Sequence, residues 1–253
     1  MSMRSPIKDL RFKNHSLAPL KSLIEKGSTV NTYGLFSGNV EISLSLADVK
    51  VNALTDKPII YQFWYCLFEN SDRLYNILTH ESFKFRGVGE YSLLQEGLPR
   101  YKDSYYRSSL FFMLNRCSVT GQVASGQFNP DNYTPVALNH LRTFEKPPLF
   151  DIFYQHDSQL KLPEADYTLF HSLNFSYNLT SIGSPQSYDS YNFNNRKLRN
   201  LLSDETSGRV VMIYNKHPGL FKFYKDRSLL MVDKYGRQTQ DKKDCEEIIV
   251  TNF

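Results

Sequence analysis

Cysteine is scarce in this chain of 253 residues, which has three: Cys66, Cys117 and Cys245. Their number is odd and they lie far apart in the sequence. This pattern excludes a disulfide framework and has none of the close spacings of a metal site. We therefore expect three reduced cysteines with structural roles and no bound metal.

Long apolar runs are missing as well. No stretch approaches the roughly 18 to 20 apolar residues that a membrane span requires. The opening residues, Met-Ser-Met-Arg-Ser-Pro, contain no apolar signal-peptide core. The sequence therefore predicts a soluble cytoplasmic protein that does not engage a membrane.

Three common catalytic signatures do not occur. The chain has no Gly-Lys-Ser or Gly-Lys-Thr phosphate loop, no His-Glu-x-x-His and no Gly-x-Ser-x-Gly. The sequence thus gives no indication of a P-loop nucleotidase, a zinc protease of that type or a hydrolase with the usual nucleophile elbow.

The net charge is mildly positive, +4, with a pI of about 8.8. Basic residues gather in the segments 4–13, 196–199 and 222–243, and aspartates interrupt the last of these. Two interpretations remain open. The charges can pair with one another on a solvated surface, or they can form a basic face for phosphates.

The stretch 28–46 organises the chain. An apolar segment runs into Gly34 and Gly38, and apolar residues then recur from Val40 to Leu46. This layout predicts a strand, a glycine turn and the start of a helix, the place where an open α/β sheet receives a nucleotide-like ligand. Glycine lets the backbone approach such a ligand, although the same layout also occurs as a plain turn.

A second predicted strand, 50–54, leads to Asp56, and Pro58 suits the first position of a helix. A carboxylate at this point can accept hydrogen bonds from both hydroxyls of a ribose. It can equally serve as a helix cap.

The middle of the chain is rich in apolar helical patterns. Residues 59–78 predict one helix, broken near Asn70 with Ser71 capping a second helix, and we interpret 86–89 as a turn. A further helix ends at Asn115-Arg116 and is followed by a short polar hairpin that leads to Phe128-Asn129-Pro130.

These motifs, in this order, resemble the DNA adenine-N6 methyltransferases of the Dam class. Residues 115–129 resemble the target-recognition region of that family, and 34–38 its Asp-Leu-Phe-Ser-Gly-x-Gly loop for S-adenosylmethionine. Residues 55–58 resemble its ribose-binding Asn-Asp-x-Asn, and 246–253 its closing strand. The resemblance covers nearly the whole chain, and no single motif is decisive.

The resemblance implies two sets of binding residues. Those toward S-adenosylmethionine are Gly34, Phe36, Gly38 and Asp56. Those toward DNA are Arg11, Lys13, Asn115, Arg116 and Asn129. The hairpin after Arg116 is about three residues shorter than is usual in the family and lacks its basic residue. We therefore expect contacts with the DNA backbone rather than base-specific reading.

The residues that methyl transfer needs are changed. Family enzymes carry Asp-Pro-Pro-Tyr after a core strand, because acceptors must hold the amine of a flipped adenine while a ring stacks on the base. Here the predicted strand 167–171 is followed by Ser172, Leu173, Asn174 and Phe175. Ser172 is a weak, uncharged acceptor and both prolines are missing. We expect transfer to adenine to be absent.

The residues of the implied cofactor site also differ from those of the family. Gly34 replaces the first Asp of the loop, and Val40 replaces its last Gly, which puts a branched side chain on the expected path of the methionine moiety. Residues 11–16 stand where the family has Lys-Trp-x-Gly-Gly-Lys, and the glycine pair is missing. These changes argue against S-adenosylmethionine binding.

The predicted fold is α/β: a Rossmann-like methyltransferase core, with a twisted, mostly parallel sheet and helices on both faces. Residues 1–60 and 150–253 would form the core, and 61–149 an inserted helical and hairpin recognition subdomain. Five strands are predicted, at residues 30–35, 50–54, 167–171, 210–214 and 247–252. We interpret residues 216–219, which follow the fourth of them, as a strand-end loop.

Three functions remain open. The favoured one is a catalytically inactive methyltransferase-like protein that acts as a DNA-binding or assembly subunit. The second is an active adenine-N6 methyltransferase in which Asn174 or a main-chain carbonyl accepts from the amine. The third is a structural or protein-interaction subunit without DNA binding, partnered with an active methyltransferase or a larger assembly. The distribution of the family suggests a viral or mobile-element origin.

Overall fold

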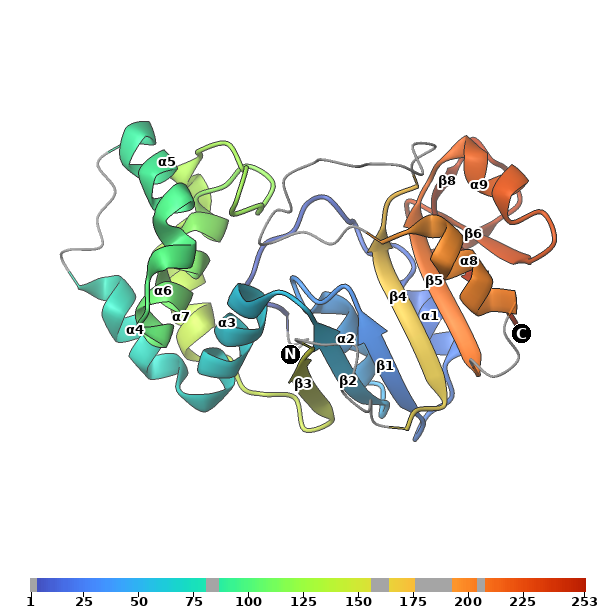
Figure 1. Cartoon of the computed structure of the whole chain (residues 1–253), viewed down its shortest axis with the longest axis horizontal. Helices are drawn as coiled ribbons and strands as arrows, with labels where there is room; N and C mark the ends of the chain where they lie inside the picture. The colour runs from blue at the N-terminus through green and yellow to red at the C-terminus, as the bar shows by residue number, and fades with distance from the viewer. Residues whose placement is uncertain (1–3, 81–86, 156–163, 176–192, 204–207) are drawn as a thin grey trace.

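The computed structural model of this chain describes five segments (Figure 1). They are residues 4–80, 87–155, 164–175, 193–203 and 208–253.

One sheet of eight strands in the described residues forms the centre, in the order β3-β2-β1-β4-β5-β8-β6-β7. The strands are β1 (Thr29–Tyr33), β2 (Lys50–Thr55), β3 (Phe150–Tyr154), β4 (Tyr167–Leu173), β5 (Arg209–Asn215), β6 (Ser228–Asp233), β7 (Gln238–Thr239) and β8 (Cys245–Thr251). The first five in that order run parallel, and β8 is antiparallel to both β5 and β6. The strand order reverses between β1 and β4, which is the Rossmann-like switch point where ligands usually bind.

Helices cover both faces of the sheet, as the sequence predicted. They are α1 (Leu17–Leu23), α2 (Asn39–Ser45), α3 (Pro58–Glu69), α4 (Ser71–Thr79), α5 (Val88–Gly97), α6 (Ser104–Arg116), α7 (Pro135–Arg142), α8 (Asn195–Ser203) and α9 (Pro218–Phe223), with 3₁₀ turns at Leu98–Arg100 and Pro130–Asn132. Alternate residues of β5 separate the two faces: Val211 joins the core cluster that contains α1, and Met212 joins the one that contains α8 and α9. The period of two along a strand thus divides the hydrophobic core into two layers.

Helices α4 to α7 lie beside the sheet, next to the β3 edge (Figure 1). They are joined to it through α3. Phe63 contacts Phe111 of α6 at 5.2 Å between ring centroids, and Trp64 contacts Phe150 of β3 at 5.7 Å. All four rings belong to one buried cluster. The expected boundary between residues 60 and 61 therefore falls inside a helix that packs on the sheet.

The five predicted strands are confirmed as β1, β2, β4, β5 and β8, with ends shifted by one or two residues. The prediction missed β3, β6 and β7. The 59–78 helix is two helices, as expected, but the side chain of Asn70 rather than that of Ser71 caps the second, accepting from the backbone N–H of Arg73 at 2.9 Å.

Two predicted turns are the starts of helices. Gly87 is the residue before α5, which begins at Val88, so the interpretation of 86–89 as a turn is wrong for its described part. Residues 216–219 were expected to be a strand-end loop, but α9 begins at Pro218, where the fixed φ of proline suits the first helical position.

None of the helices that the structure describes is long and apolar enough to cross a membrane.

Candidate functional site

The turn between β1 and α2 lies at the switch point, and its two glycines are needed by the protein's own packing. Gly34 has φ +109°, and a Cβ there would lie 2.6 Å from the carbonyl oxygen of His171. Gly38 has φ +71°, and a Cβ there would lie 2.5 Å from the Trp64 ring. The sequence predicted that these glycines make room for a ligand. In the structure, protein atoms occupy that space.

Phe36, between the two glycines, is also held by the protein. It is buried, and its carbonyl oxygen accepts a hydrogen bond from Trp64 Nε1 at 3.0 Å. The guanidinium of Arg11 lies over its ring at 4.5 Å and is bound by Asp9 at 2.9 and 3.1 Å. One face of the Phe36 ring is therefore covered by the Arg11 guanidinium.

A cavity of about 190 Å³ opens at the ends of β1, β2 and β3. We call it the Asp56 cavity. It is lined by Tyr33, Gly34, Leu54, Thr55, Asp56, Gln155 and Phe193. The carboxylate of Asp56 is 61% exposed and lies 3.8 Å from Lys57 Nζ, and the Tyr33 ring stacks on Phe170. The cavity thus offers a carboxylate, an amide and aromatic rings, which are groups that can bind a nucleoside.

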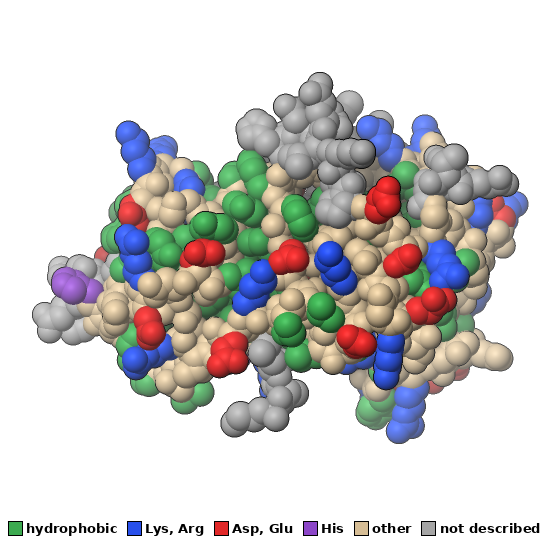
Figure 2. All heavy atoms as spheres, turned by 90° about the horizontal axis from the view of Figure 1, so that it is seen from below, with side chains coloured by type: hydrophobic (Ala, Val, Ile, Leu, Met, Phe, Trp, Pro, Cys, Tyr) green, Lys and Arg blue, Asp and Glu red, His purple; other side chains and the backbone are tan. Residues whose placement is uncertain are grey.

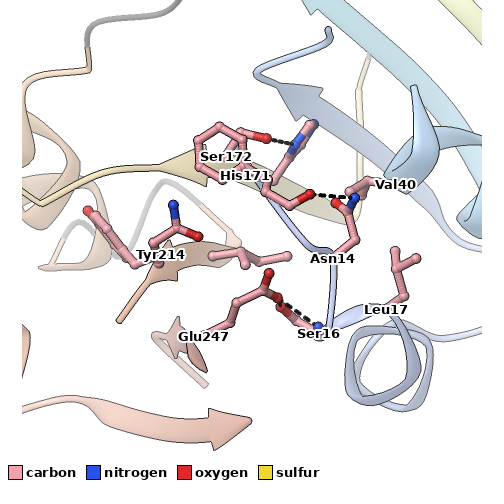
Figure 3. A pocket seen from close by; sticks show the side chains of 11 residues that line it. Asn14, Ser16, Leu17, Val40, His171, Ser172, Tyr214 and Glu247 are labelled. Atoms are coloured by element: carbon pink, nitrogen blue, oxygen red, sulfur yellow. Dashed lines mark hydrogen bonds between the residues drawn. The ribbon is translucent and has the colours of Figure 1, made fainter. Parts of the chain in front are cut away.

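A second cavity, the Ser172 cavity, lies between the ends of β4, β5 and β8 and the N-terminal segment (Figure 3). Its lining includes Phe12, Asn14, Ser16, Leu17, Val40, His171, Ser172, Tyr214, Asn215 and Glu247. Its volume is only about 10 Å³, room for a single water molecule.

A third cavity, the Lys13 cavity, has a volume of about 240 Å³ and adjoins the second, since Asn215 and Glu247 line both. The rest of its lining is Arg11, Lys13, His15, Lys216 and Glu246. Lys13 Nζ lies 3.6 Å from the Glu246 carboxylate, and Lys216 Nζ donates to the carbonyl of Lys243 at 2.8 Å.

Glu247 fastens the N-terminal segment to β8. The buried carboxylate accepts from the backbone N–H of Ser16 at 2.8 Å and from the hydroxyl of the same residue. These contacts set the position of the segment that lines both cavities (Figure 3).

A chain of hydrogen bonds runs inward from the end of β4. Ser172 Oγ lies 3.0 Å from His171 Nδ1, and His171 Nε2 lies 2.7 Å from Oε1 of Glu41 on α2. The same oxygen accepts from the Thr32 hydroxyl at 3.1 Å. Burial raises the pKa of Glu41, but His171, a backbone hydrogen bond and Thr32 lower it by more, so that its pKa lies below the usual value.

The other residues at the predicted catalytic position are bound by their neighbours. Leu173 is buried in the second core cluster, and Asn174 Oδ1 accepts from Asn215 Nδ2 at 3.0 Å. The Phe175 ring packs against His217 at 5.1 Å and Phe223 at 5.2 Å. The structure thus brings all four residues to the carboxyl end of β4, where the sequence placed them.

The residues expected to contact DNA are separated into two groups. Arg11 and Lys13 lie at the Lys13 cavity, whereas Asn115, Arg116 and Asn129 lie among the helices. Asn115 is fully buried: its amide binds the N–H and C=O of Lys8 at 2.8 Å each and the C=O of Gly121 at 2.6 Å. In this structure Asn115 joins two backbone segments and has no group left for a base.

Arg116 and Asn129 also make local contacts. Arg116 Nε donates to the carbonyl of Asn132 at 3.1 Å, and burial lowers the pKa of its guanidinium. Asn129 Oδ1 accepts from the N–H of Asp131 at 2.8 Å and so begins a 3₁₀ turn.

Glu41 and Glu247 are buried carboxylates that the sequence reasoning missed. Glu41 follows Val40 and precedes Ile42 in an apolar helix, and Glu247 precedes Ile248 in an apolar strand. An acidic residue inside an apolar run is a signal for a paired, buried carboxylate.

No group of three or more His, Cys, Asp or Glu side chains in the described segments could hold a metal ion. No protein-family model and no curated protein matches this chain.

Proposed function

We propose that this protein is a catalytically inactive relative of the Dam-class methyltransferases that binds DNA through its phosphates, or serves as an assembly subunit. The observation that carries the proposal is the small size of the Ser172 cavity. It lies between Val40, which the resemblance places on the path of the methionine moiety, and residues 12–16, which the resemblance places in the cofactor site. At about 10 Å³, that space has no room for such a group.

The residues at the transfer position support the same conclusion. Methyl transfer requires acceptors that face the amine of a flipped adenine and an aromatic ring that stacks on it. Here Asn174 is bound to Asn215, and Phe175 packs against α9. Both side chains therefore have partners within the protein.

The sheet also agrees with the resemblance. β8 lies antiparallel between β5 and β6, which departs from the six-stranded order of a dinucleotide-binding sheet. The resemblance predicts an additional strand at residues 246–253, the part of the chain in which β8 lies.

The charges favour contacts with phosphates over contacts with bases. Lys13 is 66% exposed beside Arg11 and Lys216, whereas the amide of Asn115 is already fully bonded. The face in Figure 2 carries Lys and Arg side chains interspersed with Asp and Glu, so its described residues form no patch of one sign. We therefore place the DNA contact at the Lys13 cavity.

Calorimetric titration tests this proposal. S-adenosylmethionine should give no heat, and a short duplex should bind with an affinity that falls steeply as salt is raised. Lys13→Glu should weaken duplex binding, whereas Lys21→Glu, on the outer surface of α1, should not. Methyl transfer to an adenine-containing duplex would refute the inactive assignment. If the duplex does not bind, DNA binding is excluded and the assembly role remains as the proposed function.

The open Asp56 cavity favours a second candidate, an active methyltransferase with a divergent Ser-Leu-Asn-Phe motif. Its exposed carboxylate could hold a ribose. This candidate requires that Asn174→Ala and Phe175→Ala abolish methyl transfer. Equal activity in the wild type and both variants would exclude it.

A further inference from the structure

Two basic segments that are distant in the sequence come together in the fold. Residues 196–199 lie in α8, residues 222–227 form the end of α9 and the turn after it, and Figure 1 shows both helices at the end of the molecule away from α4 to α7. Arg199 Nη2 lies 3.2 Å from the carboxylate of Asp226, and Arg227 Nη2 donates to Ser203 Oγ at 2.7 Å. These contacts join α8 to the turn after α9.

Cations outnumber carboxylates where the two segments meet. We call this region the α8–α9 surface, and its basic residues are Arg196, Lys197, Arg199, Lys222, Lys225 and Arg227. Asp226 is the one acidic residue within 196–203 and 218–227, and its carboxylate is already bound by Arg199. The basic side chains of the surface therefore carry more positive charge than Asp226 can neutralise.

Four of these cations are available to a partner. Arg196, Lys197, Lys222 and Lys225 are exposed, and none of them forms an ion pair within the described part of the chain. Asn194 Oδ1 accepts from the backbone N–H of Arg196 at 3.0 Å and from that of Lys197 at 3.1 Å, which fixes the first turn of α8. Exposed cations of this kind release counterions when they meet phosphates.

α9 connects the surface to the Lys13 cavity. The helix begins two residues after Lys216, which lines that cavity. Lys242 Nζ lies 4.6 Å from the centre of the Phe221 ring, and the guanidinium of Arg199 lies 5.2 Å from that of the Phe223 ring. Cations therefore follow α9 from the cavity at its start to α8 at its end.

The chemistry of the surface fits a nucleic-acid backbone best. None of the large hydrophobic side chains that are exposed in the described segments belongs to α8, α9 or the turn after α9. A protein interface takes most of its energy from apolar and aromatic anchors, and stable attachment to a membrane needs a buried apolar group besides the charges. A row of phosphates requires only cations.

We propose that the α8–α9 surface binds the phosphates of nucleic acids, independently of base sequence, and extends the contact that begins at the Lys13 cavity. The inference rests on the DNA binding proposed above for its partner, but it depends on different residues. Because no base is read, the surface should bind single strands as well as duplexes.

Fluorescence anisotropy with a labelled duplex tests the inference. The double variant Arg196→Gln, Lys197→Gln should lower the slope of log K against log salt by about two, because each phosphate contact contributes about 0.9 to that slope. At about 0.1 M salt this loss corresponds to binding that is about fiftyfold weaker. A second duplex of unrelated sequence should bind the wild type equally well.

The matched control is the double variant Lys21→Gln, Lys26→Gln. It removes the same charge from α1 and the turn after it, and α1 packs on the face of the sheet opposite to α8. Its salt slope should equal that of the wild type.

Lys13→Glu separates this inference from the function proposed above. If Lys13→Glu weakens binding and the α8 double variant does not, the contact at the Lys13 cavity stands and the present inference is wrong. If only the α8 double variant weakens binding, the α8–α9 surface binds nucleic acid and the contact at the Lys13 cavity is wrong.

Three outcomes would overturn the inference. They are an unchanged salt slope in the α8 double variant, an equal loss of affinity in the lysine control, and a wild-type protein that binds neither a duplex nor a single strand, whether or not it binds phosphatidylserine vesicles.

Discussion

At the scale of single residues, several positions expected to meet ligands or DNA make contacts within the protein itself. Asn115 is the clearest case. Its position at the end of an apolar helix is compatible with base reading, yet its amide joins Lys8 to Gly121. Phe36 and Gly38 are similar, because Trp64 contacts both. A polar residue or a glycine in a motif shows which local backbone conformation is possible. The tertiary contacts decide which groups that residue touches.

Asn115→Ala should lower the free energy of unfolding by about 3 kcal/mol, because it leaves one buried and two partly buried backbone groups without their partner. Asn139→Ala, on the exposed face of α7, should change it by less than about 0.5 kcal/mol. Urea unfolding of both variants measures the difference. Equal stability of the two would show that Asn115 is available for another role.

At the scale of elements, the turn between β1 and α2 is held by its neighbours. His171 approaches it from β4 and Trp64 from α3. The turn therefore depends on two elements, α3 and β4, that lie elsewhere in the sequence. This explains why a glycine pattern could predict where the turn lies without revealing what fills it.

Gly38→Ala should destabilise the protein by about 2 to 4 kcal/mol, the sum of an unfavourable φ and a clash with the Trp64 ring. Gly27→Ala is the matched control: its φ is +77°, but no atom lies within 4 Å of the added Cβ, so only the conformational cost of about 1 to 2 kcal/mol applies. Thermal unfolding of the two variants compares them. Equal losses of stability in the two variants would mean that the Trp64 ring moves to make room for the added methyl group.

At the scale of the whole molecule, buried tyrosines occur in both core layers. Burial raises the pKa of Tyr33, Tyr133 and Tyr214, and raises that of Tyr224 to about 12. The Tyr214 and Tyr224 hydroxyls are 2.8 Å apart and join β5 to the end of α9. The folded state therefore holds these groups neutral at a pH where an unfolded chain would ionise them.

The sign of the pH effect follows from this difference. An unfolded tyrosine ionises near pH 10, so the stabilisation is complete below that pH and is lost as the pH rises toward about 12. We expect Tm to fall steeply between pH 9 and 11.5. Tyr224→Phe should show a shallower fall, and the exposed Tyr235→Phe should match the wild type. If Tm falls equally with pH in the wild type and in both variants, the raised pKa of Tyr224 does not contribute to the pH dependence of stability.

The sequence by itself determined the α/β class, five of the strands, the position of the glycine turn and the place of residues 172–175 at a strand end. These features follow from periodicity and turn chemistry, which act between near neighbours along the chain. It did not place β3, β6 or β7, because most residues of these strands are only partly buried, so their apolar patterns are weak. Only the tertiary structure decided which side chains meet. It closed the space beside Val40, and it joined Ser172 and His171 to Glu41, 130 residues from His171 in the sequence, because buried polar groups must find partners wherever the fold provides them.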